Sequence, residues 1–154
     1  MTQRTLRKSF WWIVPGRLAG MRQPQETELD ILNVEGIGAI VSVMDDPANL
    51  EWYAAARLPY RWLPTTGGQA PTRAQIEDFQ QFVEAENQAG RAVAVHCSSG
   101  RRRTGTFLAA YLILKGASYE EAVAAIAQAN PAVEMREAQL SFLKSLASER
   151  SGPD

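Results

Sequence analysis

Apolar residues along the chain follow two patterns, which predict strands that alternate with helices. Continuous apolar runs, typical of strands buried on both faces, occur at 37–43 (IGAIVSV) and 91–95 (RAVAV). Shorter runs rich in aromatic residues predict two further strands at 10–14 and 60–63. Apolar residues at helical spacing predict the helices, which we expect at about 25–33, 47–58, 72–87, 104–115, 118–128 and 134–147.

Capping residues mark where two of these helices begin. Thr72 with Gln75, and Ser118 with Glu121, have the spacing of a capping box. In this motif a hydroxyl accepts a hydrogen bond from a backbone N–H three residues on, and the side chain there returns the bond. The helices that follow should therefore start at fixed positions.

The alternation of strands and helices predicts an α/β fold. Parallel strands need crossover helices, and these cover both faces of the sheet. We therefore expect a single domain with a central, mostly parallel sheet of four or five strands flanked by helices on both faces. A length of 154 residues suits one domain. Its expected limits are 10–148, with an N-terminal tail at 1–9 and a frayed C-terminal tail at 149–154.

Composition and charge exclude several classes of protein. Sixteen basic against seventeen acidic residues leave no basic field for nucleic acid, so we expect no nucleic-acid partner. The apolar run at 10–14 is too short for a signal peptide, and no run approaches the roughly 18 residues that span a membrane. We expect a soluble, cytoplasmic monomer without membrane insertion.

The single cysteine lies in the most informative segment of the chain, HCSSGRRRTGT at 96–106. One cysteine excludes an internal disulfide and a tetrahedral Cys/His zinc site. Cys97 follows a predicted strand and precedes a predicted helix, whose free N–H groups attract anions and lower the pKa of a thiol. Arg103 offers a fork for two phosphate oxygens, and the Thr104 hydroxyl can hydrogen-bond the sulfur. His96 is expected to order the loop.

Other interpretations of this segment fit its residues less well. A buried core thiol beside solvated arginines would not require Cys, Gly, Arg and Thr to fall together in one strand–turn–helix. A nucleotide-binding loop needs Lys and Ser or Thr after its second glycine, whereas Thr106 and Phe107 follow Gly105. A thiol-relay reductase needs more than one cysteine. The remaining pattern is H-C-x5-R-[ST].

This pattern resembles the active-site signature of cysteine-dependent protein tyrosine phosphatases, and most closely the small, atypical dual-specificity branch. The resemblance extends to WWIVPGRLAG at 11–20, GIGAIVSV at 36–43 and the helices after the signature. It implies hydrolysis of phosphotyrosine, and of phosphoserine or phosphothreonine, through a phosphocysteine and without metal or cofactor. The implied partner is a phosphorylated protein or small phosphorylated molecule.

The resemblance also implies roles for individual residues. Cys97 would attack phosphorus, Arg103 would hold the phosphoryl oxygens, and Thr104 would stabilise the departing thiolate. The implied phosphate-binding residues are those of the signature loop, Ser98, Ser99, Gly100, Arg101, Arg102 and Arg103.

One expected residue is missing. The family places a general-acid Asp in the loop after the strand at 60–63, and this chain has Thr65 there, with no carboxylate between Arg61 and Glu77. General acid catalysis contributes roughly 10²–10⁴-fold. Candidate replacements are Asp45, Asp46 and Glu134, although the aspartates before Pro47 also suit a turn and Glu134 a helix start.

The missing acid leaves two alternatives open. A substrate with a good leaving group hardly needs a proton, and Arg101 and Arg102 would suit several phosphates. The chain could then act on an inositol polyphosphate, a phosphoinositide or a 5′-triphosphate. The other alternative is a phosphate-binding module without turnover, against which the intact Cys97, Arg103 and Thr104 argue.

Overall fold

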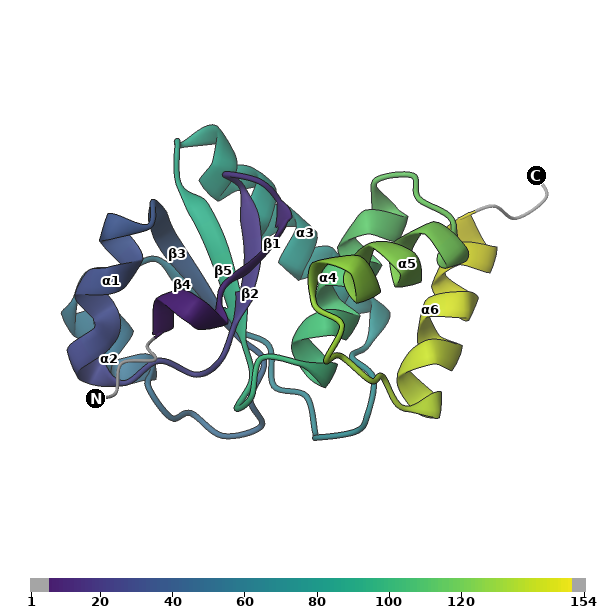
Figure 1. Cartoon of the computed structure of the whole chain (residues 1–154), viewed down its shortest axis with the longest axis horizontal. Helices are drawn as coiled ribbons and strands as arrows, with labels where there is room; N and C mark the ends of the chain where they lie inside the picture. The colour runs from purple at the N-terminus through teal and green to yellow at the C-terminus, as the bar shows by residue number, and fades with distance from the viewer. Residues whose placement is uncertain (1–5, 151–154) are drawn as a thin grey trace.

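A five-stranded sheet forms the centre of the molecule in the computed structural model, which describes residues 6–150 (Figure 1). The strand order is β1-β2-β5-β3-β4, with β1 antiparallel to β2 and every other pair parallel. This confirms the predicted single α/β domain with a mostly parallel sheet. The strands are β1 Trp11–Val14, β2 Leu18–Met21, β3 Ile37–Ser42, β4 Tyr60–Trp62 and β5 Ala92–His96.

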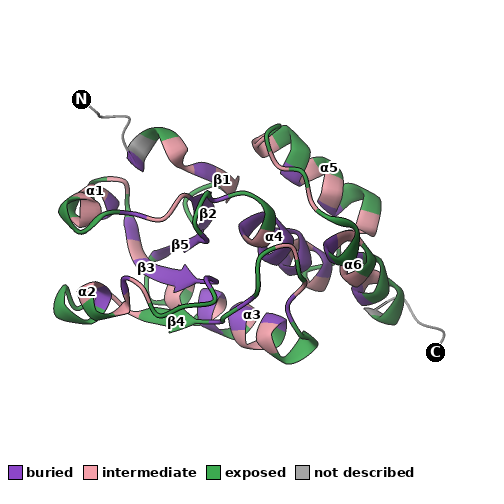
Figure 2. Ribbon diagram, turned by 90° about the horizontal axis from the view of Figure 1, so that it is seen from below, coloured by how far each residue is buried: buried purple, intermediate pink, exposed green. Residues whose placement is uncertain are grey.

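Helices cover both faces of the sheet, as predicted (Figure 2). Successive residues of β5 belong alternately to the apolar clusters on the two faces. Val93 and Val95 belong to the larger apolar cluster, under α3 to α6. Ala92 and Ala94 belong to the smaller cluster, with residues of η1, α1 and α2. The helices are η1 Leu6–Ser9, η2 Glu26–Glu28, α1 Leu29–Val34, α2 Leu50–Ala55, α3 Arg73–Gln88, α4 Arg102–Leu114, α5 Tyr119–Ala129 and α6 Glu137–Arg150.

Both predicted capping boxes are present. The Thr72 hydroxyl accepts from the Gln75 N–H at 3.1 Å, and the Gln75 side chain accepts from the Thr72 N–H at 2.9 Å. Ser118 and Glu121 repeat the arrangement at 3.0 and 2.9 Å. The starts of α3 and α5 are therefore fixed by local hydrogen bonds that the sequence shows directly.

Two elements near the N-terminus were not predicted. Strand β2 is short and has no β-branched residue, and it forms because β1 and β5 pair with its two edges. Leu6 is completely buried in the smaller cluster, and η1 contacts β2. Residues 6–9 therefore pack on the domain, although the sequence placed them in a tail.

Two predicted helices are shorter in the structure. The helix expected at 47–58 is α2, which begins at Leu50 because Asn49 adopts a left-handed conformation with φ 78°. The helix expected from Glu134 is α6, which begins at Glu137. Arg102 Nε donates to the Glu134 carbonyl at 2.8 Å, and the Arg136 N–H donates to the Gln139 side chain, so these backbone groups bond outside the helix.

Candidate active site

The signature loop lies between β5 and α4, at the edge of the sheet where the parallel strands end. Cys97 follows the last residue of β5, and α4 begins at Arg102. β3 and β4 end at the same edge, so Asp45 and Thr65, which follow these strands, lie beside the loop. In sheets of this kind, ligands bind beyond the carboxyl ends of the strands.

The backbone of the loop is held from outside through its carbonyl groups. His96 Nδ1 lies 3.1 Å from the Cys97 carbonyl oxygen, the Gln23 N–H donates to the Ser98 carbonyl at 3.1 Å, and Trp11 Nε1 donates to the Gly100 carbonyl at 3.1 Å. With these carbonyls bonded outward, loop N–H groups are left to converge on the inside. Converging N–H groups form a cradle for an oxyanion.

Gly100 is required by the shape of this cradle. Its φ is +78°, a conformation that side chains with Cβ rarely adopt, and an added Cβ would overlap the Met21 carbonyl group of β2. At Gly100 the loop therefore approaches β2 more closely than any residue with a Cβ would permit.

Cys97 lies at the base of the cradle, with 2% of its surface exposed. Burial by itself raises the pKa of the thiol, but hydrogen bonds outweigh it and the net pKa is lowered. The donors are the Thr104 hydroxyl, 3.2 Å from Sγ, and the backbone N–H groups of Thr104, Arg101 and Gly100. The arrangement favours the thiolate, which is the nucleophilic form of cysteine.

Arg103 extends along the rim of the cradle, and its guanidinium is largely buried. Nη1 donates to the Thr65 carbonyl at 2.8 Å, and Nη2 donates to Ser98 Oγ at 3.3 Å. These two bonds align a planar fork of donors beside the loop, the geometry that binds two oxygens of a phosphoryl group.

The three carboxylates considered as general acids lie in different surroundings. Asp45 is 53% exposed, and its Oδ1 lies 3.8 Å from Arg103 Nη1. Asp46 Oδ1 accepts from the Ala48 N–H at 2.9 Å, which is turn chemistry before α2. Glu134 lies in the loop before α6, where Arg102 binds its carbonyl. The Asp45 carboxylate therefore lies beside the Arg103 guanidinium, whereas Glu134 meets the signature loop through its backbone carbonyl.

Thr65 does not replace the missing acid. Its side chain is buried, and its hydroxyl donates to the Leu63 carbonyl at 3.1 Å. The surrounding loop is tied down by Gln75, whose amide donates to the Pro64 carbonyl at 2.8 Å, and by Gln139, whose amide donates to the Gln69 carbonyl at 3.2 Å.

Two hollows with basic side chains flank the signature loop. One, of about 600 Å³, is lined by Arg102, Arg136 and the backbone around Gly67-Gly68. The other, of about 290 Å³, is lined by Lys8, Ser99 and Arg101. The two arginines that precede Arg103 therefore line two separate hollows.

Four residues that support the loop were missed by sequence reasoning. Trp11 and Gln23 bind its carbonyls, and Tyr53 and Asn49 form a buried chain of hydrogen bonds behind His96. Each is far from the signature in sequence, so only the fold brings them to it. The one indication in the sequence was that Asn49 and Gln23 are polar and lie in segments that follow strands ending at the catalytic edge.

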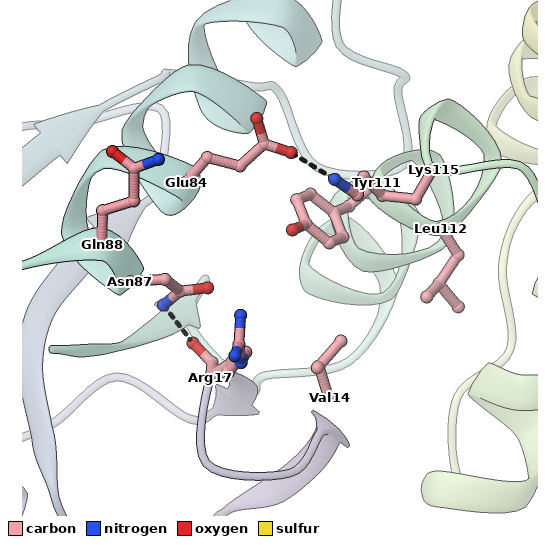
Figure 3. A pocket seen from close by; sticks show the side chains of 8 residues that line it. All are labelled: Val14, Arg17, Glu84, Asn87, Gln88, Tyr111, Leu112 and Lys115. Atoms are coloured by element: carbon pink, nitrogen blue, oxygen red, sulfur yellow. Dashed lines mark hydrogen bonds and ion pairs between the residues drawn. The ribbon is translucent and has the colours of Figure 1, made fainter. Parts of the chain in front are cut away.

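A further hollow of about 710 Å³ lies away from the signature loop, between the β1–β2 turn and the carboxyl ends of α3 and α4 (Figure 3). Its lining includes Arg17, Tyr111 and the ion pair between Lys115 and Glu84. The length of α4, about 20 Å at 1.5 Å per residue, separates it from Cys97. It contributes no group to the site.

Within the described residues, no helix combines the length and apolar character needed to cross a membrane. The same residues contain no group of three or more His, Cys, Asp and Glu side chains arranged to hold a metal ion.

Comparison with known proteins identifies relatives of the whole domain. A family model described as "Swiss Army Knife protein, DSP-PTPase phosphatase domain" matches residues 7–151. The crystal structure of Tk-PTP in the active form covers 91% of this chain and 97% of its own, with a TM-score of 0.83 and 28% identity. That of PTPMT1 in complex with PI(5)P covers 94% and 99%, with a TM-score of 0.81 and 25% identity.

A curated relative matches part of the chain. The "Phosphatidylglycerophosphatase and protein-tyrosine phosphatase 1" of Rattus norvegicus is 41% identical over 75 residues, which are 48% of this chain and 39% of the rat protein. The match thus spans less than half of the length of that relative.

Proposed function

Because the chain belongs to the DSP-PTPase phosphatase domain family of Swiss Army Knife proteins and is a cysteine-based phosphatase, we propose that it hydrolyses phosphoprotein monoesters, phosphotyrosine first, through a phosphocysteine on Cys97. The observation that carries this proposal is the convergence of the Thr104 hydroxyl and three backbone N–H groups on one sulfur, with the Arg103 fork beside it. A cytoplasmic location stays a prediction.

The proposed reaction has two steps. Cys97 Sγ attacks phosphorus, the bond from phosphorus to the leaving oxygen breaks, and that oxygen takes its electron pair. Arg103 and the N–H groups of the loop hold the three equatorial oxygens, over which the negative charge is spread in the transition state. Water then attacks phosphorus, the bond from phosphorus to sulfur breaks, and dihydrogen phosphate is released with both protons of the water. The sulfur leaves as a thiolate, which Thr104 stabilises by its hydrogen bond of 3.2 Å.

Protonation of the leaving oxygen is the step for which the chain has no acid at the position expected in the family. We propose Asp45 for it, because its carboxylate lies at the mouth of the site, 3.8 Å from Arg103 Nη1. The Asp45→Asn variant removes the acid. Asp46→Asn is the matched control, since the Asp46 side chain faces the turn before α2.

The test is kcat/KM for aryl phosphates of graded leaving-group pKa, near pH 6. A shallow dependence that becomes steep in Asp45→Asn, but not in Asp46→Asn, supports Asp45 as the acid. A steep fall toward basic leaving groups in the unchanged protein means that no acid acts. That result would overturn the role of Asp45 and direct attention to substrates with good leaving groups.

A substrate with several phosphates is the second candidate. Arg102 and Arg136 in one hollow, and Lys8 and Arg101 in the other, offer cations beside the cradle that a simple monoester would not use. Two of the similar proteins point the same way: one is named as a phosphatidylglycerophosphatase as well as a protein-tyrosine phosphatase, and PTPMT1 has been crystallised in complex with PI(5)P.

The two candidates are separated by one pair of variants. Arg136→Ala and Arg101→Ala should leave kcat/KM for a phosphotyrosine peptide within about twofold, since exposed charges contribute little to a distant contact. For an inositol polyphosphate we expect a loss of about tenfold in at least one of them. Equal, small effects on both substrates would contradict the polyphosphate candidate.

A further inference from the structure

The hollow of about 710 Å³ between α3, α4 and the β1–β2 turn lies at the end of α4 that is remote from Cys97 (Figure 3). Its volume is within the range of roughly 300–1,000 Å³ that is typical of small-molecule sites. We call it the α3–α4 hollow. It is lined by the apolar side chains of Val14 and Leu112, by Tyr111, and by the charged side chains of Arg17, Glu84 and Lys115.

Tyr111 presents to this hollow a hydroxyl that has no partner among the described residues. The residue is 7% exposed, and its ring packs edge-on against Phe79 with the ring centroids 6.1 Å apart. In the described part of the chain, no side-chain nitrogen or oxygen is both sealed from solvent and without a hydrogen bond. The Tyr111 oxygen therefore opens onto the hollow, into which it points in Figure 3. Nearly all buried polar groups have a partner, so this hydroxyl is a donor available to a ligand.

The charges around the α3–α4 hollow leave one cation unbalanced. Lys115 Nζ lies 2.7 Å from Glu84 Oε2, so these two side chains neutralise each other. Arg17 belongs to the β1–β2 turn, and its guanidinium points into the same space without an ion pair to any residue that the structure describes. Burial raises the pKa of Tyr111, and the positive charges of Lys115 and Arg17 partly oppose this rise, as expected for cations close to the hydroxyl. The hollow thus combines a neutral tyrosine donor with an unpaired guanidinium.

The walls of the hollow are held in place by contacts within the protein. The side-chain amide of Asn87 donates to the carbonyls of Arg17 and Arg91, at 3.1 and 2.9 Å, which ties the end of α3 to the β1–β2 turn. The ion pair between Lys115 and Glu84 ties α4 to α3. A ligand that enters such a preformed site loses little free energy to reordering of the protein.

We propose that the α3–α4 hollow is a binding site for a small amphiphilic monocarboxylate. The two carboxylate oxygens accept from the guanidinium of Arg17 and from the hydroxyl of Tyr111. The apolar body of the ligand packs against Val14 and Leu112. One unpaired guanidinium balances one negative charge, and the nearby Glu84 carboxylate disfavours a second, so a phosphate dianion fits less well. The site does not depend on catalysis by Cys97.

Octanoate is a suitable probe, because it joins a carboxylate to a short apolar chain. In calorimetric titration of the full chain, with inorganic phosphate present to occupy the cradle, we expect saturable binding of one octanoate. Octan-1-ol and octylammonium should bind at least about tenfold more weakly, because neither carries the negative charge. Lack of saturable binding, displacement of octanoate by phosphate, or equal binding of octan-1-ol would overturn the proposal.

Two variants remove the polar contacts one at a time. Arg17→Gln should weaken the binding of octanoate at least about tenfold, and Tyr111→Phe about threefold, in line with the loss of a charged and of a neutral hydrogen bond. Arg57→Gln is the matched control, because it removes an exposed positive charge that lines a different hollow. Equal losses of affinity in Arg17→Gln and Arg57→Gln would mean that only the net charge matters, which contradicts a site at Arg17.

The same variants test a purely structural role of Arg17. A cation near the carboxyl ends of α3 and α4 also offsets the negative ends of the helix dipoles. If Arg17 does only this, Arg17→Gln lowers the melting temperature and binds octanoate as tightly as the unchanged protein, and the proposal fails.

Leu112→Trp tests the apolar part of the site, because the larger side chain fills the hollow and leaves its charges unchanged. We expect this variant to lose the binding of octanoate, and full binding would place the ligand elsewhere and overturn the proposal. Cys97→Ser should bind octanoate as tightly as the unchanged protein. The result at this site is therefore independent of whether the chain hydrolyses phosphate esters.

Discussion

Three backbone N–H groups and one hydroxyl donate hydrogen bonds to the sulfur of Cys97, and together they outweigh the effect of burial on the pKa of the thiol. Burial alone would raise the pKa of the thiol and leave it inert. The Thr104 hydroxyl and the N–H groups of Gly100, Arg101 and Thr104 stabilise the negative charge and lower the net pKa. At the scale of single residues, Thr104 is the side chain whose removal should change this balance most directly.

Thr104→Val should therefore raise the pKa of Cys97, because it removes a hydrogen bond to the thiolate and keeps the shape of the side chain. The pH at which alkylation of Cys97 by iodoacetamide reaches half its maximal rate should move upward. Thr106→Val is the control, since the Thr106 hydroxyl bonds the Arg102 carbonyl at 2.7 Å and not the sulfur. An unchanged profile in Thr104→Val would contradict the role of this hydroxyl.

The sequence could predict some of these residues and not others. Cys97, Arg103 and Thr104 follow from the spacing H-C-x5-R-[ST], because one strand–turn–helix holds them all. The support of the loop by Trp11, and by Asn49 and Tyr53, depends on contacts between segments separated by 89 and 43 residues. No local pattern records such contacts.

At the scale of elements, the signature loop is held between β2 on one side and α4 on the other. β2 lies directly against Gly100, and the Trp11 side chain of β1 reaches the Gly100 carbonyl. The sequence of β2 alone could not predict this strand. Its four residues, Leu18–Met21, have little strand propensity of their own, and small side chains there let the loop and the Trp11 ring approach.

Gly100→Ala should damage the loop more than an equivalent change elsewhere. A left-handed conformation costs an alanine about 1–2 kcal/mol, and the added Cβ also overlaps the backbone of β2. We expect kcat/KM to fall by roughly 10²-fold, the loss that a small misplacement of catalytic groups can cause. Activity is measured with an aryl phosphate and stability by thermal unfolding.

Gly90→Ala is the matched control for this prediction. Gly90 has φ +88°, and no atom lies within 4 Å of an added Cβ, so the strain is similar and the overlap is absent. Equal losses of activity in the two variants would contradict the requirement for close approach at Gly100.

At the scale of the whole molecule, the fold class, the alternation of the strands and most helices were predictable, because they depend on hydrophobic periodicity and capping boxes. The boundaries that were wrong depend on tertiary contacts. α2 begins late because Asn49 turns its side chain into the buried chain, and α6 begins late because Arg102 binds the Glu134 carbonyl. In both cases groups near the active site override local helix propensity.

The buried His96 connects the site to the stability of the whole domain. In the folded protein its pKa is lowered to about 4 by burial, whereas the unfolded chain takes up a proton below the ordinary value of 6.5. Between these values the unfolded state binds more protons, so the free energy of unfolding decreases as the pH falls. The lowered pKa corresponds to a loss of up to about 3 kcal/mol by pH 4.

Urea unfolding at a series of pH values from 7 to 4 measures this loss. His96→Asn keeps a donor toward the Cys97 carbonyl and does not titrate, so its stability should fall less steeply over the same range. The carboxylates contribute equally to both proteins. Identical slopes would contradict a neutral, buried His96.

The central claim is that Cys97 carries the phosphoryl group during turnover, and it is tested most directly by acid quenching of the enzyme during hydrolysis of an aryl phosphate, followed by mass spectrometry of its peptides. We predict one phosphoryl group on the peptide that contains Cys97. We also predict none in Cys97→Ser, whose turnover should fall by roughly 10⁴-fold or more although it stays folded. Hydrolysis at the normal rate by Cys97→Ser, or turnover with no phosphorylated Cys97 peptide, would contradict the account.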